Sequence, residues 1–279
     1  MSRVAVATSS NAEDPDAPLL LAALARAGLE ADHVAWDAPA NWNAYDLVVV
    51  RSTWDYVERR DEFLDWARSV RRLANPYPII EYSSDKHYLG DLASRGHLVV
   101  PSTFCDVGDA PVLPDGDFVV KPAVGAGSAD AVRYRAHQRD AARAHVARLH
   151  AAGRDALIQP YVASVDELGE RAVVVIDGII SHAATKHAML NVDPGARTSA
   201  FRHGQLRRAA PEPDVLAAAA AFLEDERFAD LLYARVDVVA TEAGWALLEL
   251  ELVEPMLFLT FDDGAADRLA AAIARRARR

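Results

Sequence analysis

The most constraining segment of the chain is 233–255, in which two apolar runs carry charged side chains at alternate positions and are separated by 242–244. A three-residue loop at 242–244 predicts a β-hairpin with Thr241 opposite Trp245. Alternate residues of a strand point to the same face, so one face of this hairpin is expected to be apolar and the other charged. The predicted apolar face consists of Val236, Val238, Leu248 and Leu250.

The charged face of the hairpin predicts a metal site. In the same register Asp237 lies opposite Glu249 and Arg235 lies opposite Glu251, with all four side chains on one face. Three clustered carboxylates repel one another, and one arginine cannot neutralise them all. A hard cation that binds oxygen ligands can neutralise all three carboxylates. We therefore favour a site for Mg²⁺ shared with a nucleotide over a solvated acidic face. The repulsion also predicts that Glu249→Gln leaves the metal-free protein at least as stable.

The composition is that of a globular protein, with 51% hydrophobic and 25% charged residues among 279. The 41 acidic residues outnumber the 30 basic ones, so a nucleic-acid surface is not expected. The single cysteine, Cys105, excludes an internal disulfide. The N-terminal apolar run is too short for a signal peptide, and no stretch approaches the ~18 apolar residues of a membrane span. The expected location is the cytoplasm, without a membrane partner.

The first 82 residues have the pattern of a small doubly wound α/β unit. Apolar runs at 3–8, 30–36 and 47–51 predict buried strands, and helices are predicted over 16–28 and 58–73. Continuous apolar strands that alternate with helices indicate a parallel sheet covered on both faces.

The rest of the chain is richer in hairpins. Asp-Gly at 177–178 predicts a tight turn between strands at 171–176 and 179–183. The other predicted elements are a helix at 85–95 capped by Ser83 or Ser84, strands at 118–121, 131–135 and 156–159, helices at 138–151 and 212–223, and a terminal helix from 264.

Lysine is rare in this chain, so its positions are informative. Of the 30 basic residues only Lys86, Lys121 and Lys186 are lysines. Where arginine is used elsewhere, a retained lysine indicates a need for a compact, rotatable ammonium group. Lys121 ends an apolar strand and precedes the glycine-containing segment 123–129, whose small residues let backbone N–H groups approach phosphate oxygens. The alternative is an ordinary flexible turn.

A further strand end, Gln-Pro-Tyr-Val at 159–162, is stiffened by proline. Its exposed backbone could pair with a purine edge, and Asp166 or Glu167 could bind ribose hydroxyls. On its own this is also a common way for a strand to end.

Taken in order, these segments resemble the ATP-grasp superfamily over essentially the whole chain. Residues 84–89 and 118–122 resemble the first two lysine elements, 123–129 the flexible glycine loop, 159–162 the adenine hinge, 181–186 the third lysine element, and 234–237 with 249–251 the arginine and metal-ligand strands. Gln159 and Glu251 depart from the family, where Glu and Asn are common, and the second departure indicates a subfamily.

The resemblance implies ATP and a pair of Mg²⁺ ions, and it assigns residue roles. The implied catalytic residues are Arg235 and Lys186, and the implied metal ligands are Asp237, Glu249 and Glu251. The implied nucleotide-binding residues are Lys86, Lys121, Gly125, Gly127, Ser128, Gln159, Pro160, Tyr161, Val162, Asp166, Glu167 and Lys186.

Within the superfamily, 51–56 (Arg-Ser-Thr-Trp-Asp-Tyr) together with 249–255 resembles the cyclo-ligases of cycloserine biosynthesis. Residues 51–56 follow a strand at the carboxyl end of the N-terminal sheet, where open α/β sheets bind ligands. Arg51 could bind a carboxylate and Asp55 an ammonium group; the alternative is a structural Arg/Asp pair with Trp54 nearby. The full set of expected substrate residues is Arg51, Asp55, Arg197, Arg235 and Glu254.

The resemblance implies that ATP phosphorylates a small amino-acid-like carboxylate and that a nitrogen nucleophile then displaces phosphate. In a cyclo-ligase O-ureido-D-serine supplies both groups and closes to D-cycloserine. The alternatives are an intermolecular ligase of the glutathione synthetase or D-alanine–D-alanine ligase type, and a nucleotide-binding regulatory protein without chemistry. Retention of Arg235 and the acidic ligands argues against the regulatory protein. A homodimer is left open.

The expected fold is an α/β ATP-grasp fold built from three domains and a connection. They are an N-terminal doubly wound parallel-sheet domain at 1–82, a connecting helical segment at 83–116, a small central lid domain at 117–180 and a C-terminal antiparallel-sheet catalytic domain at 181–279.

Overall fold

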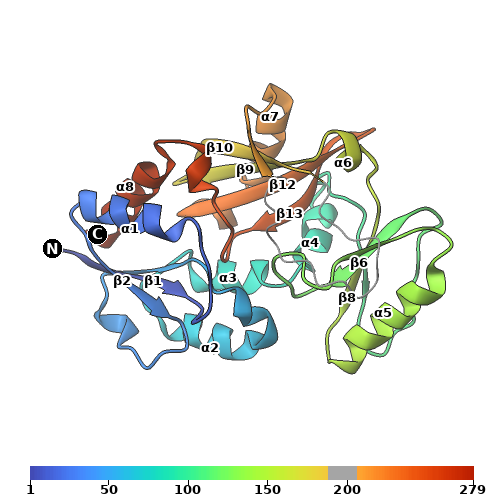
Figure 1. The fold of residues 1–279 in the computed structure, drawn as a ribbon, viewed down its shortest axis with the longest axis horizontal. Coiled ribbons are helices and arrows are strands. Elements are labelled where there is room, and N and C mark those ends of the chain that lie inside the picture. The colour runs from blue at the N-terminus through green and yellow to red at the C-terminus, as the bar shows by residue number, and fades with distance from the viewer. Residues whose placement is uncertain (188–205) are drawn as a thin grey trace.

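The computed structural model describes residues 1–187 and 206–279, and three β-sheets organise them (Figure 1). One sheet is parallel and lies near the N-terminus, and the other two are antiparallel, which confirms the predicted fold class. No helix in this described part of the chain is both long enough and apolar enough to pass through a lipid bilayer.

The N-terminal sheet has buried central strands, as the continuous apolar runs predict. Its strand order is β2 (Glu30–Ala35), β1 (Arg3–Thr8), β3 (Leu47–Val50) and β4 (Leu73–Ala74). Helices α1 (Ala17–Arg26) and α8 (Ala265–Ala277) pack on one face, and α2 (Arg60–Ser69) packs on the other.

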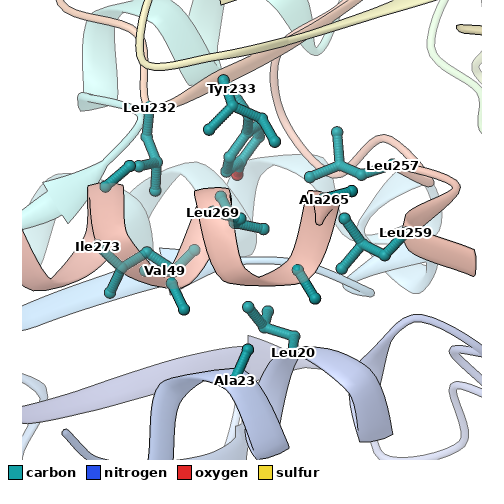
Figure 2. Close-up of a cluster of buried hydrophobic side chains, with 14 of the residues drawn as sticks. Leu20, Ala23, Val49, Leu232, Tyr233, Leu257, Leu259, Ala265, Leu269 and Ile273 are labelled. Atoms are coloured by element: carbon teal, nitrogen blue, oxygen red, sulfur yellow. The ribbon is translucent and has the colours of Figure 1, made fainter. Parts of the chain in front are cut away.

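The terminal helix α8 joins the two ends of the chain in one core. Figure 2 shows Leu269 of α8 between Leu20 of α1 and Tyr233, and all three side chains are buried. The predicted segments 1–82 and 181–279 therefore share an apolar core. They are not two domains with separate cores.

The C-terminal sheet positions most of the charged residues discussed below. Its strand order is β11 (Leu206–Ala209), β10 (Ile179–Lys186), β9 (Glu170–Ile176), β12 (Tyr233–Thr241) and β13 (Gly244–Glu251). One face packs against α4 (Tyr88–Ser94) and α7 (Pro213–Phe222), and the other packs against α8. Asp177 and Gly178 form the predicted two-residue turn, both with positive φ.

The lid sheet has the strand order β5 (Thr103–Cys105), β8 (Ala156–Pro160), β6 (Phe118–Pro122) and β7 (Val132–Tyr134). Helix α5 (Arg139–Ala151) covers its apolar face. Strand β5 comes from the predicted connecting segment, whereas β9 pairs with β10 and β12 of the C-terminal sheet. We therefore propose that the lid ends between β8 and β9, near 161–169, rather than at 180.

Several helices differ from the sequence prediction. Residues 77–83 form α3 (Tyr77–Ser83), which tolerates its prolines because Pro76 is the N-cap residue and Pro78 lies in the first turn, where N–H groups need no helical partner. Helix α4 begins at Tyr88 without a side-chain cap, and Ser83 instead binds the backbone of β13. The remaining short elements are η1 (Trp42–Ala44), η2 (Trp54–Glu58), α6 (Ser164–Glu167), η3 (Glu226–Phe228) and η4 (Leu259–Phe261).

Candidate active site

A cavity lies where the lid sheet meets β9, β10, β12 and β13 of the C-terminal sheet. Its polar lining includes the three lysines of the chain. The predicted site residues that line it are Lys86, Lys121, Gly125, Gly127, Ser128, Gln159, Lys186, Arg235, Glu249, Glu251 and Glu254.

The β12–β13 hairpin pairs the charged residues as predicted, but its turn and its pairing near the turn differ from the prediction. Arg235 pairs with Glu251 and Asp237 pairs with Glu249. The turn, however, has two residues, because Thr241 pairs with Gly244 rather than with Trp245. A β-bulge after Asp237 then shifts the pairing by one residue, which restores the predicted register at the charged face.

The bulge also changes the apolar face. Leu247 pairs with Val238 and is buried in the core, whereas Leu248 is half-buried and lines the cavity. The prediction that Leu248 belongs to the core face was therefore wrong, because the inserted residue turns it toward the cavity.

The carboxylates of Asp237, Glu249 and Glu251 form one cluster, hereafter the carboxylate cluster, whose oxygens lie within 4.8 Å of one another. Asp237 is completely buried, and the side chains of Glu249 and Glu251 are 22% and 28% exposed. A solvated acidic face is therefore excluded. Three hard oxygen donors at this separation fit a divalent cation such as Mg²⁺.

Lysines neutralise much of this cluster in the structure. Lys186 Nζ lies 2.7 Å from Asp237 Oδ2 and 2.7 Å from Glu170 Oε2. Lys86 Nζ lies 3.0 Å from Glu249 Oε1 and donates to the Gly125 carbonyl at 2.7 Å. The arginine is therefore not the only counter-charge.

Arg235 is held on several sides. Its Nε and Nη2 donate to the two Asp237 oxygens at 2.9 and 3.0 Å, and Nη2 also donates to Glu251. Its Nη1 donates to the Met256 carbonyl at 2.9 Å, and its guanidinium carbon lies 5.3 Å from the Phe258 ring centre. This fixes the direction in which a planar cation faces the cavity.

The surroundings separate the pKa values of these acids. Burial opposes ionisation of Glu249, but Lys86 and Lys121 hold its pKa well below the usual range. Burial raises the pKa of Glu251 to about 7, because Arg235 only partly compensates and Glu249 repels it. Burial and the nearby Glu251 raise the pKa of Glu254 to about 8. Glu249 is therefore stabilised in its ionised form, contrary to the predicted repulsion, and Glu251 carries the electrostatic cost.

The glycine loop closes one side of the cavity. A Cβ atom at Gly125 would lie 2.9 Å from Pro122 Cγ, so this position requires glycine. Lys121 is half-buried on the same side, and burial lowers its pKa while Glu249 opposes the shift.

Of the predicted hinge residues, only Gln159 lines the cavity. Gln159 is buried and donates to Ser102 Oγ at 2.9 Å. Residues 160–162 follow it but do not line the cavity. Asp166 accepts hydrogen bonds from Tyr161 and Arg133 instead of facing the cavity, and Glu167 is exposed. In this conformation, neither carboxylate lines the cavity.

The predicted substrate residues are only partly brought together. Glu254 lines the cavity, whereas Arg51 is buried and does not line it, with its guanidinium carbon 5.3 Å from the Tyr233 ring centre. Asp55 accepts from Trp36 at 2.9 Å and from Arg59 at 3.4 Å, so it is engaged structurally and does not pair with Arg51. Arg197 lies outside the described residues.

Sequence reasoning missed several cavity residues. Glu170 is the second carboxylate on Lys186, and Tyr88 Oη accepts the Leu250 N–H at 2.8 Å. Trp54, Tyr56 and Phe258 supply aromatic walls. Pairing outward from the 177–178 turn could have found Glu170 only with knowledge of a bulge near Ser181, since regular pairing would place Gly169 opposite Lys186.

The chain is similar to characterised proteins over nearly its full length. The family described as D-cycloserine synthetase DcsG, N-terminal domain, matches residues 4–75. Cycloserine biosynthesis protein DcsG of Streptomyces lavendulae is 37% identical over 281 residues, covering 94% of each chain. The crystal structure of D-cycloserine synthetase DcsG matches with a TM-score of 0.89 at 35% identity, covering 99% of this chain and 100% of that one.

The D-alanine–D-alanine ligase of Bacillus anthracis complexed with ATP shares the fold, with a TM-score of 0.69 at 13% identity over 99% of this chain and 97% of that one. The fold, the cavity and the near full-length identity agree. The chain therefore belongs to the D-cycloserine synthetase DcsG family and is an ATP-grasp ligase that uses ATP to form a carbon–nitrogen bond.

Proposed function

We propose that this enzyme cyclises O-ureido-D-serine to D-cycloserine. ATP phosphorylates the substrate carboxylate, and the ureido nitrogen attached to oxygen then attacks the acyl carbon. The new carbon–nitrogen bond closes the ring as the acyl carbon–phosphate bond breaks and phosphate leaves. Water then hydrolyses the bond between the ring nitrogen and the carbamoyl group, which leaves as carbon dioxide and ammonia, and the ring nitrogen keeps a proton. ADP and phosphate are the nucleotide products.

The observation that carries this proposal is the cavity lined by Glu249, Glu251, Glu254, all three lysines and the aromatic walls, with the buried Asp237 completing the carboxylate cluster. Such a site can neutralise phosphate charge and hold one small amino acid. The 37% identity to a cycloserine biosynthesis protein supports the same substrate.

Asp237, Glu249 and Glu251 are the residues that would hold Mg²⁺. When bound, the ions would supply electrostatic stabilisation of the phosphate oxygens. In their presence Lys86 and Lys186 would be free to turn from carboxylates toward phosphates, because the ions take over the counter-charge.

Arg235 and Lys121 act on the transferring phosphoryl group in this proposal. Arg235 already lies in a fixed orientation, so little reorganisation is needed when negative charge develops on the acyl phosphate. The half-buried Lys121 ammonium lies beside the glycine loop, where nucleotide phosphates would bind.

Glu254 is the cavity carboxylate that we assign to the substrate ammonium group. It lines the cavity together with Trp54 and Tyr56, and its backbone carbonyl accepts a hydrogen bond from Trp54 Nε1 at 3.2 Å. An ammonium partner would favour its ionised form, which burial alone disfavours.

We also propose that the enzyme is cytoplasmic. Whether it forms a homodimer can be tested by sedimentation.

The decisive experiment supplies ATP, Mg²⁺ and O-ureido-D-serine without any other amine. We expect ADP release with stoichiometric D-cycloserine, identified by mass spectrometry, and no turnover by Arg235→Ala. ADP release that requires a second amino acid would instead identify an intermolecular ligase. Nucleotide binding without ADP release under any substrate would refute the proposed chemistry.

A further inference from the structure

The loop that follows β13 holds Arg235 and is itself held from the N-terminal part of the chain. Met256 O accepts from Arg235 Nη1 at 2.9 Å, and the Phe258 ring lies against the guanidinium. Phe258 has φ 50° and ψ 43°, a left-handed conformation that side chains of this size rarely adopt. Something must therefore fix the loop in this shape.

Asp16, more than 200 residues away in the chain, supplies that fixation. Its Oδ2 accepts the Leu257 N–H at 3.0 Å and its Oδ1 accepts the Leu259 N–H at 2.8 Å, so the two bonds flank Phe258. The carboxylate is 2% exposed. A carboxylate with two backbone donors in a buried place is a rigid, charge-assisted contact.

His182 of β10 makes the second side-chain contact to the same loop. Its Nε2 lies 2.7 Å from the Leu257 carbonyl, and only a donating N–H can satisfy that acceptor. The loop is thus tied at its amides by Asp16 and at a carbonyl by His182.

We propose that Asp16 is a positioning residue for Arg235, acting through the loop 256–259. The inference rests on the proposed role of Arg235 in the reaction. Because Asp16 belongs to the segment entering α1, this contact makes the orientation of the arginine depend on how the N-terminal sheet sits on the C-terminal sheet. Without this contact the loop 256–259 relaxes, and the Arg235 guanidinium no longer points toward the transferring phosphoryl group.

The test is Asp16→Asn, which keeps the volume but replaces one acceptor oxygen with an NH₂ group. We expect kcat with O-ureido-D-serine to fall about 100-fold, as misplacement of a catalytic group by about 1 Å can do. The KM for ATP should change less than about threefold, since no nucleotide-facing lysine is touched. The matched control is Asp267→Asn, which breaks the exposed Arg26–Asp267 pair joining α1 to α8 and should keep wild-type kinetics.

A double-mutant cycle with Arg235→Lys separates positioning from general destabilisation. If Asp16 acts through Arg235, Asp16→Asn should cost far less in the Arg235→Lys background than in the wild type. Equal costs in both backgrounds, or a lower thermal midpoint with unchanged kcat, would overturn the proposal. Wild-type kinetics of Arg235→Lys alone would instead refute the proposed role of Arg235, and the inference with it.

His182→Phe provides an independent variant in case Asp16→Asn does not fold. It removes the other tie to the loop and should also lower kcat while sparing the KM for ATP. Unchanged kcat in a folded His182→Phe would count against control of Arg235 by this loop.

Discussion

Replacing Glu251 with Gln should stabilise the metal-free protein while abolishing catalysis. The side chain accepts a hydrogen bond from Arg235 and is 28% exposed, and its pKa is raised to about 7 because burial and Glu249 outweigh the arginine. A glutamine oxygen can still accept that bond, but it brings no charge into the carboxylate cluster.

The magnitude follows from the pKa shift. The ordinary pKa is 4.5, so a folded value of about 7 disfavours the ionised form by up to about 3 kcal/mol at pH 8 and by under about 1 kcal/mol at pH 5. Between these values the folded protein binds more protons than the unfolded chain, so wild-type stability should fall as pH rises from 4.5 through 7. Glu251→Gln should lack this loss.

Glu249→Gln is the opposing control. Because Lys86 and Lys121 lower the pKa of Glu249, its charge stabilises the fold, and removing it leaves the buried Lys86 ammonium without its carboxylate partner. The variant should be less stable than the wild type, the reverse of what mutual repulsion predicts from the sequence.

The assay is urea unfolding at pH 5 and pH 8 with EDTA, alongside ADP release across a Mg²⁺ titration. Both variants should lose Mg²⁺-dependent turnover, while their stabilities move in opposite directions. The reasoning is refuted if Glu251→Gln is less stable than the wild type at pH 8. It is also refuted if the difference in unfolding free energy between Glu251→Gln and the wild type is the same at pH 5 and pH 8.

Further predictions concern the lysines, the glycine loop and the lid. Lys121→Ala should raise the KM for ATP with little change in thermal midpoint, whereas Lys186→Ala should lower both activity and midpoint because Asp237 loses a buried partner; equal midpoints would contradict this. Residues 123–129 should gain hydrogen-exchange protection with an ATP analogue plus substrate, and unchanged exchange would count against a closing loop. Burial lowers the pKa of His145 to about 4, so wild-type stability should fall as pH drops from 6.5 to 4, and His145→Phe should lose less over that interval, measured by urea midpoints.

The sequence alone determined the kinds of element and the chemistry of the site. Continuous apolar strands predicted the buried parallel sheet, and alternation in 233–255 predicted a hairpin with a charged face. The scarcity of lysine singled out three residues that all line one cavity. These inferences succeed because burial periodicity and side-chain chemistry are local properties of a sequence.

Tertiary structure decided which residues meet. In the β12–β13 hairpin a two-residue turn and a bulge at Leu248 produce the register that a three-residue loop would also give, and packing of Leu247 into the core selects the bulge. In the β9–β10 hairpin the bulge at Ser181 brings Glu170 to Lys186. Arg268 of α8 binds Ser181 Oγ at 3.0 Å, a contact between segments far apart in the chain.

The counter-charges of the carboxylate cluster were likewise invisible in the sequence. Lys86 reaches Glu249 from a segment more than 160 residues away, and Asp16 reaches the loop that holds Arg235 from the other end of the chain. A pKa depends on every charge and on the burial around a group, so the sign of the Glu249 shift follows only once these elements are packed together.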